Sequence, residues 1–275
     1  MSTPSAQPSS SEPALFGPAL FGPGDRPAVI GHRGSSWVAP QNTLAAFEAA
    51  CRAGVDAIEL DLQLTSDQVV VVIHDDEVDA TTDGTGPVAG FTAAELGALD
   101  AGSWFAPAFA GARVPLWPQV LDLVAAHPQV GLLIELKGDW TPAQTRLALD
   151  PLLAAGLGPR SIGQSFSRTS VAAIREVAPG LRRGLLVEDA ADDLLEACAA
   201  LGVLTCNPSG LMLQADPRLV ARLHAAGLAV MVWTLDEDWM WRQTVDLGVD
   251  AIISNRPDRL AGWLAGRLTA TAGIA

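Results

Sequence analysis

The chain has 275 residues, 49% of them hydrophobic, so it is long enough to bury a sizeable core within one large domain. Its 31 acidic residues outnumber its 17 basic ones, and the resulting net charge of −14 argues against general binding to nucleic acid or anionic lipid. Three cysteines without a CxxC pair imply no disulfide framework and favour a reducing compartment.

Residues 1–25 are rich in Ser, Pro, Ala and Gly, and they lack the basic start and the apolar stretch of a signal peptide. No apolar run in the chain approaches the roughly 20 residues that span a bilayer. We therefore predict a flexible tail over 1–25, a folded domain over 26–270, a cytoplasmic location and no membrane insertion. Nothing in the sequence marks an oligomer interface.

The folded part begins with a short apolar run, Ala28 to Ile30, which ends at a Gly-His pair. We predict a strand there, followed by a helix capped by Asn42 or Thr43 and ended by Gly54. The next strand, residues 57–64, alternates Glu59, Asp61 and Gln63 with apolar residues, so one of its faces is polar. In a closed barrel that polar face can point inward at the mouth.

A third apolar run, Val69 to Ile73, is predicted to pair with residues 57–64 and to end at His74. The following stretch, about 75–113, is rich in Gly, Thr and Asp and contains one short helix, Thr92 to Leu99. It is too long for an ordinary connection, so we interpret it as an insertion over the site.

Regular alternation of strands and helices then resumes. The predicted strands begin near residues 28, 57, 131, 161, 183, 203, 229 and 251, and the predicted later helices cover about 117–126, 141–155, 168–177, 191–200, 216–226, 238–247 and 257–268. Eight strand–helix units favour a closed (β/α)8 barrel, a TIM barrel, over an open doubly wound sheet, which remains the alternative.

Chemically capable side chains gather where these strands end, which is where barrel enzymes place their active sites. The candidates are His32, Arg33, Glu59, Asp61, His74, Glu135, Lys137, Gln164 and Trp233. Any one of them singly fits an ordinary structural role, but all of them map to one rim.

Three of these candidates are carboxylates. Glu59 and Asp61 are two residues apart on a strand, so both point to the same side, and Glu135 supplies a third carboxylate from another strand end. Carboxylates held close together repel each other unless a cation joins them. An all-oxygen set suits Mg²⁺ or Ca²⁺, with Mn²⁺ also possible, better than zinc.

His32 and His74 suit acid–base catalysis because imidazole titrates near neutral pH. Arg33 and Lys137 can neutralise phosphate oxygens, or pair with the neighbouring carboxylates in the resting protein. Gln164 and Trp233 are candidate substrate contacts. His127 and His224 are interpreted as structural, and the segment from Thr82 to Gly86 is read as a turn because it lacks the ending of a P-loop.

In order and spacing, the motifs of this chain resemble those of the glycerophosphodiester phosphodiesterases. The similarity runs from about Pro27 to Leu260 and includes Gly31-His32-Arg33-Gly34, Pro40-Gln41-Asn42-Thr43, Glu59-Leu60-Asp61, His74-Asp75, Ile134-Glu135-Leu136-Lys137, Val232-Trp233-Thr234 and Ser254-Asn255-Arg256-Pro257. Each motif alone is weakly specific, whereas their combination is highly specific.

The resemblance implies a (β/α)8 barrel with a small insertion after the second strand, and hydrolysis of glycerophosphodiesters to an alcohol and sn-glycerol 3-phosphate. It implies His32 and His74 as the acid–base pair and a divalent cation held by Glu59, Asp61 and Glu135. Arg33 and Lys137 would then contact the phosphate.

The chain also departs from the family pattern. Gln41 stands where the family usually has Glu, which keeps the hydrogen-bonding reach but removes a charge that could tune a histidine or the metal. Ala80 and Asp236 replace a frequent Arg and a frequent Asn. These changes bear on substrate preference more than on reaction type.

Two other functions remain open at this point. One is a lysophospholipase D, which needs an apolar groove for an acyl chain, for example around Trp104, Phe105 and Phe109. The other is a non-catalytic barrel that binds a phosphorylated ligand, favoured only by Gln41. The expected substrate is in each case a small phosphodiester or phosphate compound and not a nucleic acid.

Overall fold

The protein is described from a computed structural model that covers residues 26–189 and 191–272. The tail predicted at 1–25 therefore lies outside the described residues. In the described part, no helix has the length and apolar character needed to cross a membrane.

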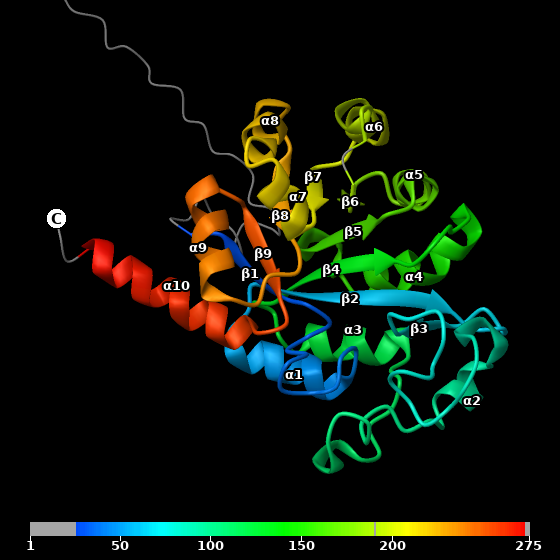
Figure 1. Ribbon diagram of the computed structural model, residues 1–275. Coiled ribbons are helices and arrows are strands. Elements are labelled where there is room, and N and C mark those ends of the chain that lie inside the picture. Colours follow the sequence, from blue (N-terminus) through cyan, green and yellow to red (C-terminus); the bar gives the residue numbers. More distant parts are fainter. Residues whose placement is uncertain (1–25, 190, 273–275) are drawn as a thin grey trace, which may run out of the picture.

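Eight parallel strands close into a barrel, as the alternating pattern predicted (Figure 1). In barrel order they are β1 (Ala28–Gly31), β2 (Ala57–Leu64), β4 (Gly131–Leu136), β5 (Ser161–Ser165), β6 (Arg182–Val187), β7 (Thr205–Pro208), β8 (Ala229–Val232) and β9 (Ala251–Ser254). The barrel closes because β1 pairs with both β9 and β2. This closure rules out the open doubly wound sheet.

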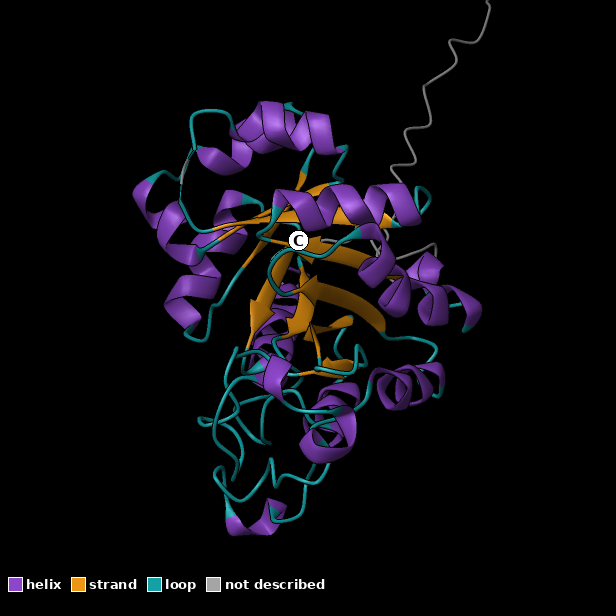
Figure 2. Cartoon of the chain, turned by 90° about the vertical axis from the view of Figure 1, so that its right-hand side faces the viewer, coloured by secondary structure: helices purple, strands orange, loops and turns teal. Residues whose placement is uncertain are grey.

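Helices surround the strands on the outside (Figure 2). They are α1 (Leu44–Ala53), α3 (Trp117–Ala125), α4 (Pro142–Ala154), α5 (Arg168–Val177), α6 (Leu194–Leu201), α7 (Gly210–Ala215), α8 (Leu219–Ala225), α9 (Asp238–Leu247) and α10 (Pro257–Ala272). Thr43 caps α1, because its side chain accepts from the backbone N–H of Ala46, and Gly54 ends the helix in the left-handed conformation at φ 74°.

The helix predicted over 216–226 is confirmed as α8 but begins only at Leu219, and the short helix α7 before it was not predicted. The structure has two short helices, α7 and α8, on either side of Asp216 and Pro217. Proline disfavours the helical conformation of the residue before it, and Asp216 accordingly lies at φ −138° and ψ 87°. Helix α6 also begins three residues later than predicted, at Leu194 rather than at 191.

The two faces of β2 bury different kinds of side chain, as its alternating sequence predicted. Ile58, Leu60 and Leu62 face outward into the large core between barrel and helices. The opposite face points into the barrel, where Ala57 joins a small apolar core at one end of the interior. Further along the same inward face come Glu59 and Asp61. The inner face is therefore apolar at the bottom of the barrel and acidic toward its mouth.

The segment after β2 forms a loop-rich extension beside the barrel. It begins with β3 (Val70–Val72), which pairs antiparallel with β2, and includes α2 (Ala93–Leu96) and two 3-10 turns, Val88–Gly90 and Pro107–Phe109. Figure 1 shows this extension as cyan and green loops around α2, projecting from the barrel. It has a core of its own, formed by Val71, Ile73, Val78, Val88, Leu96, Ala101 and Val114.

Candidate active site

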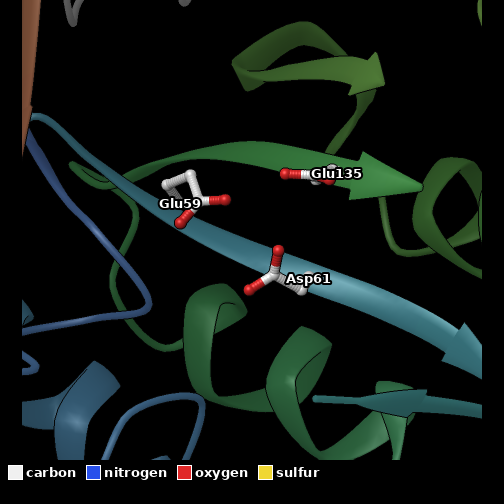
Figure 3. A group of neighbouring side chains, drawn as sticks. All are labelled: Glu59, Asp61 and Glu135. Atoms are coloured by element: carbon white, nitrogen blue, oxygen red, sulfur yellow. The ribbon is translucent and has the colours of Figure 1, made fainter. Parts of the chain in front are cut away.

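Three carboxylates converge inside the barrel mouth (Figure 3). Glu59 and Asp61 come from β2, and Glu135 comes from β4, where the strand register places it directly beside Asp61. One carboxylate oxygen from each side chain lies within 4.8 Å of the others. All three side chains are buried, with Asp61 only 1% exposed. The structure thus brings together the three acidic residues that the sequence predicted as a cluster.

The cluster carries an electrostatic cost. Burial and the neighbouring carboxylates of Asp61 and Glu135 raise the pKa of Glu59 well above its usual range. Burial and Asp61 raise the pKa of Glu135 to about 7. Burial is the largest single influence on Asp61 and acts to raise its pKa, but Arg33, His74, Lys137 and the hydrogen bond from Asn42 together outweigh it, so the pKa is lowered. Repulsion therefore opposes ionisation of all three carboxyl groups at once unless positive charge lies beside them.

Two basic side chains supply part of that charge. Lys137 Nζ lies 2.9 Å from Glu135 Oε1 and 3.8 Å from Asp61 Oδ1, and Arg33 Nε lies 3.5 Å from Asp61 Oδ2. Burial acts to lower the pKa of Lys137, but Glu135 and Asp61 outweigh it and raise that pKa, so the lysine is charged at neutral pH. Arg33 Nε is buried and donates no hydrogen bond within the described structure.

The donor set fits a divalent cation of the magnesium or calcium type. It offers three carboxylates from two neighbouring strands, with no Cys and no His among the clustered ligands. A cation bound there would relieve the repulsion that raises the pKa of Glu59. Glu59, Asp61 and Glu135 would hold it.

A tight turn after β1 aims His32 and Arg33 into the site. Arg33 adopts a left-handed conformation at φ 55°, and its backbone N–H donates to Glu59 Oε2 at 2.9 Å. Gly34 follows at φ 84°, where an added Cβ would lie 2.6 Å from the backbone of Ala46. Glycine is required at this position because both the conformation and the close approach exclude a side chain.

Each candidate histidine is held through its Nδ1 atom. His32 Nδ1 lies 2.6 Å from Asn255 Oδ1, and His74 Nδ1 lies 2.6 Å from Asp75 Oδ1. Both rings line the same cavity, so Nε2 is the nitrogen left for a substrate. Burial and the adjacent Arg33 lower the pKa of His32 to about 4, which makes this ring neutral at pH 7.

The cavity between these groups has a volume of about 390 Å³, a size typical of small-ligand sites. Of the nine residues predicted from the sequence, eight line it, and Asp61 lies just behind them within the carboxylate cluster. The cavity is lined by His32, Arg33, Glu59, His74, Glu135, Lys137, Gln164, Phe166, Leu186, Glu188, Trp233, Thr234 and Ile253.

Sequence reasoning missed several polar residues that support this site. Asn42 was predicted as a helix cap within a family motif and was given no role in the site, yet its Nδ2 donates to Asp61 Oδ2 at 2.8 Å. Asn207 orients two cavity residues, because its Nδ2 donates to Gln164 Oε1 and its carbonyl accepts from Trp233 Nε1. Asn42 could have been found from its place in the Pro-Gln-Asn-Thr motif. Asn207 offered no signal besides its position on a strand.

The residues set aside as structural have ordinary partners. His127 Nδ1 pairs with the carbonyl oxygen of Leu123, and His224 Nε2 pairs with Asp250. Trp104, Phe105 and Phe109 contact one another edge to face in the loop-rich extension. None of these three aromatic residues lines the cavity, so they do not form an acyl groove there.

Comparison with known proteins agrees with this geometry. The model of the Glycerophosphoryl diester phosphodiesterase family matches residues 32–259. A Bacillus subtilis protein, named provisionally as a glycerophosphodiester phosphodiesterase, is 38% identical over 84% of this chain and 95% of its own length.

Two solved structures share the fold. The glycerophosphodiester phosphodiesterase of Agrobacterium tumefaciens is 32% identical with a TM-score of 0.75, over 86% of this chain and 99% of that one. An Oleispira antarctica phosphodiesterase, solved in complex with the product sn-glycerol-3-phosphate, is 26% identical with a TM-score of 0.79, over 87% of this chain and 97% of that one.

Proposed function

The chain belongs to the glycerophosphoryl diester phosphodiesterase family and is a phosphoric diester hydrolase. We propose that it cleaves small glycerophosphodiesters by means of two histidines and a bound divalent cation. The products would be an alcohol and sn-glycerol 3-phosphate. The observation that carries the proposal is the meeting of His32, His74 and the three-carboxylate cluster around one cavity.

Glu59, Asp61 and Glu135 would hold Mg²⁺, Ca²⁺ or Mn²⁺, and such a cation, when bound, polarises a phosphate oxygen and neutralises its charge. Arg33 and Lys137 also line the cavity and bring positive charge to the same oxygens. Lys137 already pairs with Glu135, so it is held in place before the substrate arrives. Gln164 and Trp233 would contact the rest of the substrate.

Cleavage of a phosphodiester needs one proton removed from the attacking oxygen and one given to the leaving alkoxide. His32 and His74 would divide these two tasks through their Nε2 atoms, since their Nδ1 atoms are engaged by Asn255 and Asp75. The attacking oxygen belongs either to water or to the neighbouring glycerol hydroxyl. Attack by the hydroxyl would make the reaction proceed through a cyclic phosphate.

Hydrolysis of a panel of glycerophosphodiesters, including glycerophosphocholine, tests this function directly. We expect activity that EDTA abolishes and that added Mg²⁺, Mn²⁺ or Ca²⁺ restores, because the carboxylate cluster would lose and regain its cation. Full activity in EDTA would refute the metal dependence. Binding of phosphodiesters without turnover at any metal concentration would instead favour a non-catalytic barrel.

A lysophospholipase D is a second candidate, and a groove favours it. A cavity of about 680 Å³ shares Glu188, Trp233 and Thr234 with the catalytic cavity. Its walls include the apolar residues Leu211, Met212, Leu219 and Met240. An acyl chain would fit this environment, so the panel should include lysophosphatidylcholine. Faster hydrolysis of lysophosphatidylcholine than of glycerophosphocholine would make the lipid the preferred substrate.

Replacing Gln41 by Glu tests the role of Arg33. Gln41 Oε1 accepts a hydrogen bond from Arg33 Nη1, and Arg33 also faces Asp61. A carboxylate at position 41 would neutralise the guanidinium further and weaken its attraction for phosphate. We expect KM for glycerophosphocholine to rise about fivefold, which corresponds to roughly 1 kcal/mol for a partly exposed ion pair, with little change in kcat.

The matched control is Gln41→Met, which keeps the length of the side chain without adding charge. A similar rise in KM for Gln41→Met would show that loss of the amide, and not the added charge, causes the effect. An unchanged or lower KM in Gln41→Glu would contradict a phosphate contact by Arg33.

A further inference from the structure

A hydrogen-bonded chain links Asp236, in the loop after β8, to the ring of His32 at the end of β1. Asp236 Oδ2 accepts from Asn255 Nδ2 at 2.7 Å, and Asp236 Oδ1 accepts from the Asn255 backbone N–H at 2.8 Å. Ser254 Oγ also donates to Asp236 Oδ1 at 3.0 Å. The other end of the Asn255 amide, Oδ1, faces His32 Nδ1 at 2.6 Å.

The chemistry of Asp236 determines the direction of this chain. An ionised carboxylate only accepts hydrogen bonds, so the end of the Asn255 amide that faces Asp236 must be its NH₂ group. The carbonyl oxygen of the amide therefore faces His32, and it also accepts from Ser36 Oγ at 2.8 Å. An oxygen acceptor at this place requires a hydrogen on His32 Nδ1.

We propose that Asp236 is a positioning residue that acts through Asn255 to hold His32 in the tautomer with hydrogen on Nδ1, so that the unprotonated Nε2 faces the cavity as the proton acceptor. The proton-acceptor role rests on the proposed function, whereas the tautomer does not. His74 differs because its Nδ1 faces a carboxylate, Asp75, with which a protonated ring forms an ion pair. His74 is then the proton donor to the leaving alcohol.

The burial of His32 is consistent with this division of roles. Burial and Arg33 lower the pKa of His32 to about 4, so the ring is neutral at pH 7. Only one of its two nitrogens then carries a hydrogen. A neutral imidazole can carry that hydrogen on either nitrogen, and the partner of one nitrogen decides which. Here the partner is an amide whose orientation depends on Asp236.

Asp236→Asn gives the sharpest test because it changes the direction of the chain without changing its shape. The introduced amide can place its own NH₂ group toward Asn255, which allows the Asn255 amide to turn over and present its NH₂ group to His32 Nδ1. His32 would then carry its hydrogen on Nε2 and could no longer accept a proton there. We expect kcat to fall about a hundredfold, a typical acid–base contribution, with KM within about twofold.

Two further variants separate this role from mere stabilisation of the loop. Asp238→Asn removes an exposed carboxylate two residues away that takes no part in the chain, and it should behave like the wild type. The double variant Asp236→Asn with Asn255→Asp puts an acceptor back opposite His32 Nδ1, because the carboxylate now stands at position 255. It should recover kcat to within about tenfold of the wild type.

The tautomer itself is read from ¹⁵N NMR of the full-length protein with Mg²⁺ at pH 8, with His32 assigned by comparison with His32→Gln. We expect hydrogen on Nδ1 in the wild type and in the double variant, and on Nε2 in Asp236→Asn. A wild-type ring with hydrogen on Nε2, or a double variant as slow as Asp236→Asn, would overturn the proposal. A switched tautomer with unchanged kcat would leave the positioning intact and refute His32 as the proton acceptor.

Discussion

Alanine in place of either His32 or His74 is expected to lower kcat by about a hundredfold or more, which is the usual contribution of a general acid or base. Both rings line the same cavity, and each is held at Nδ1 by a side chain that leaves Nε2 free for a substrate. Because each histidine would handle a different proton, neither should replace the other. Steady-state kinetics on glycerophosphocholine with saturating Mg²⁺ provides the measurement.

The chain offers two matched controls for this prediction. His127 and His224 pair with a backbone carbonyl and with Asp250, away from the cavity. Their alanine variants should retain near-normal kcat, even where they lose some stability. Near-normal turnover in both His32→Ala and His74→Ala would refute the two-histidine mechanism.

Removing the charge from one member of the carboxylate cluster is expected to have an effect of similar size. Asp61→Asn and Glu135→Gln keep the shape of the buried side chains but take away an anionic ligand. Even outer partners of metal ligands typically account for 10–100-fold in metal affinity or activity. We therefore expect affinity for Mg²⁺ and turnover at fixed Mg²⁺ to fall by about a hundredfold or more.

Thermal unfolding gives a readout of the same cluster that does not depend on activity. A ligand at 100 times its Kd stabilises the folded state by about 2.7 kcal/mol, so Mg²⁺ should raise the Tm of the wild type. Asp61→Asn and Glu135→Gln should lose most of this shift.

The control here is Glu188→Gln, which removes a carboxylate from the wall of the same cavity but outside the cluster. It should keep both the Mg²⁺-dependent Tm shift and the metal affinity. Equal Tm shifts in the wild type and both cluster variants would contradict a metal site at these residues.

Much of the architecture could be predicted because it depends on local patterns. The two-residue period of β2 places Glu59 and Asp61 on one face whatever the rest of the chain does. In a closed barrel of eight strand–helix units, the carboxyl ends of all strands lie at one rim. Glu135 and His32 could therefore be expected near Glu59 and Asp61. The later start of α8 was equally local, since Pro217 disfavours a helical conformation at Asp216, yet the predicted helix began at 216.

The barrel, the acidic inner face of β2 and the residues at the mouth could be predicted without the structure, because strand period and strand–helix alternation are patterns of a few neighbouring residues. The hydrogen-bonded chain of Asp236, Asn255 and His32, in contrast, became visible only in the folded structure. Asn255 and His32 are 223 positions apart, and they meet because β9 pairs with β1 when the barrel closes. A local sequence pattern cannot predict which polar atoms of the two strands face each other, because this depends on both the strand register and the side-chain directions.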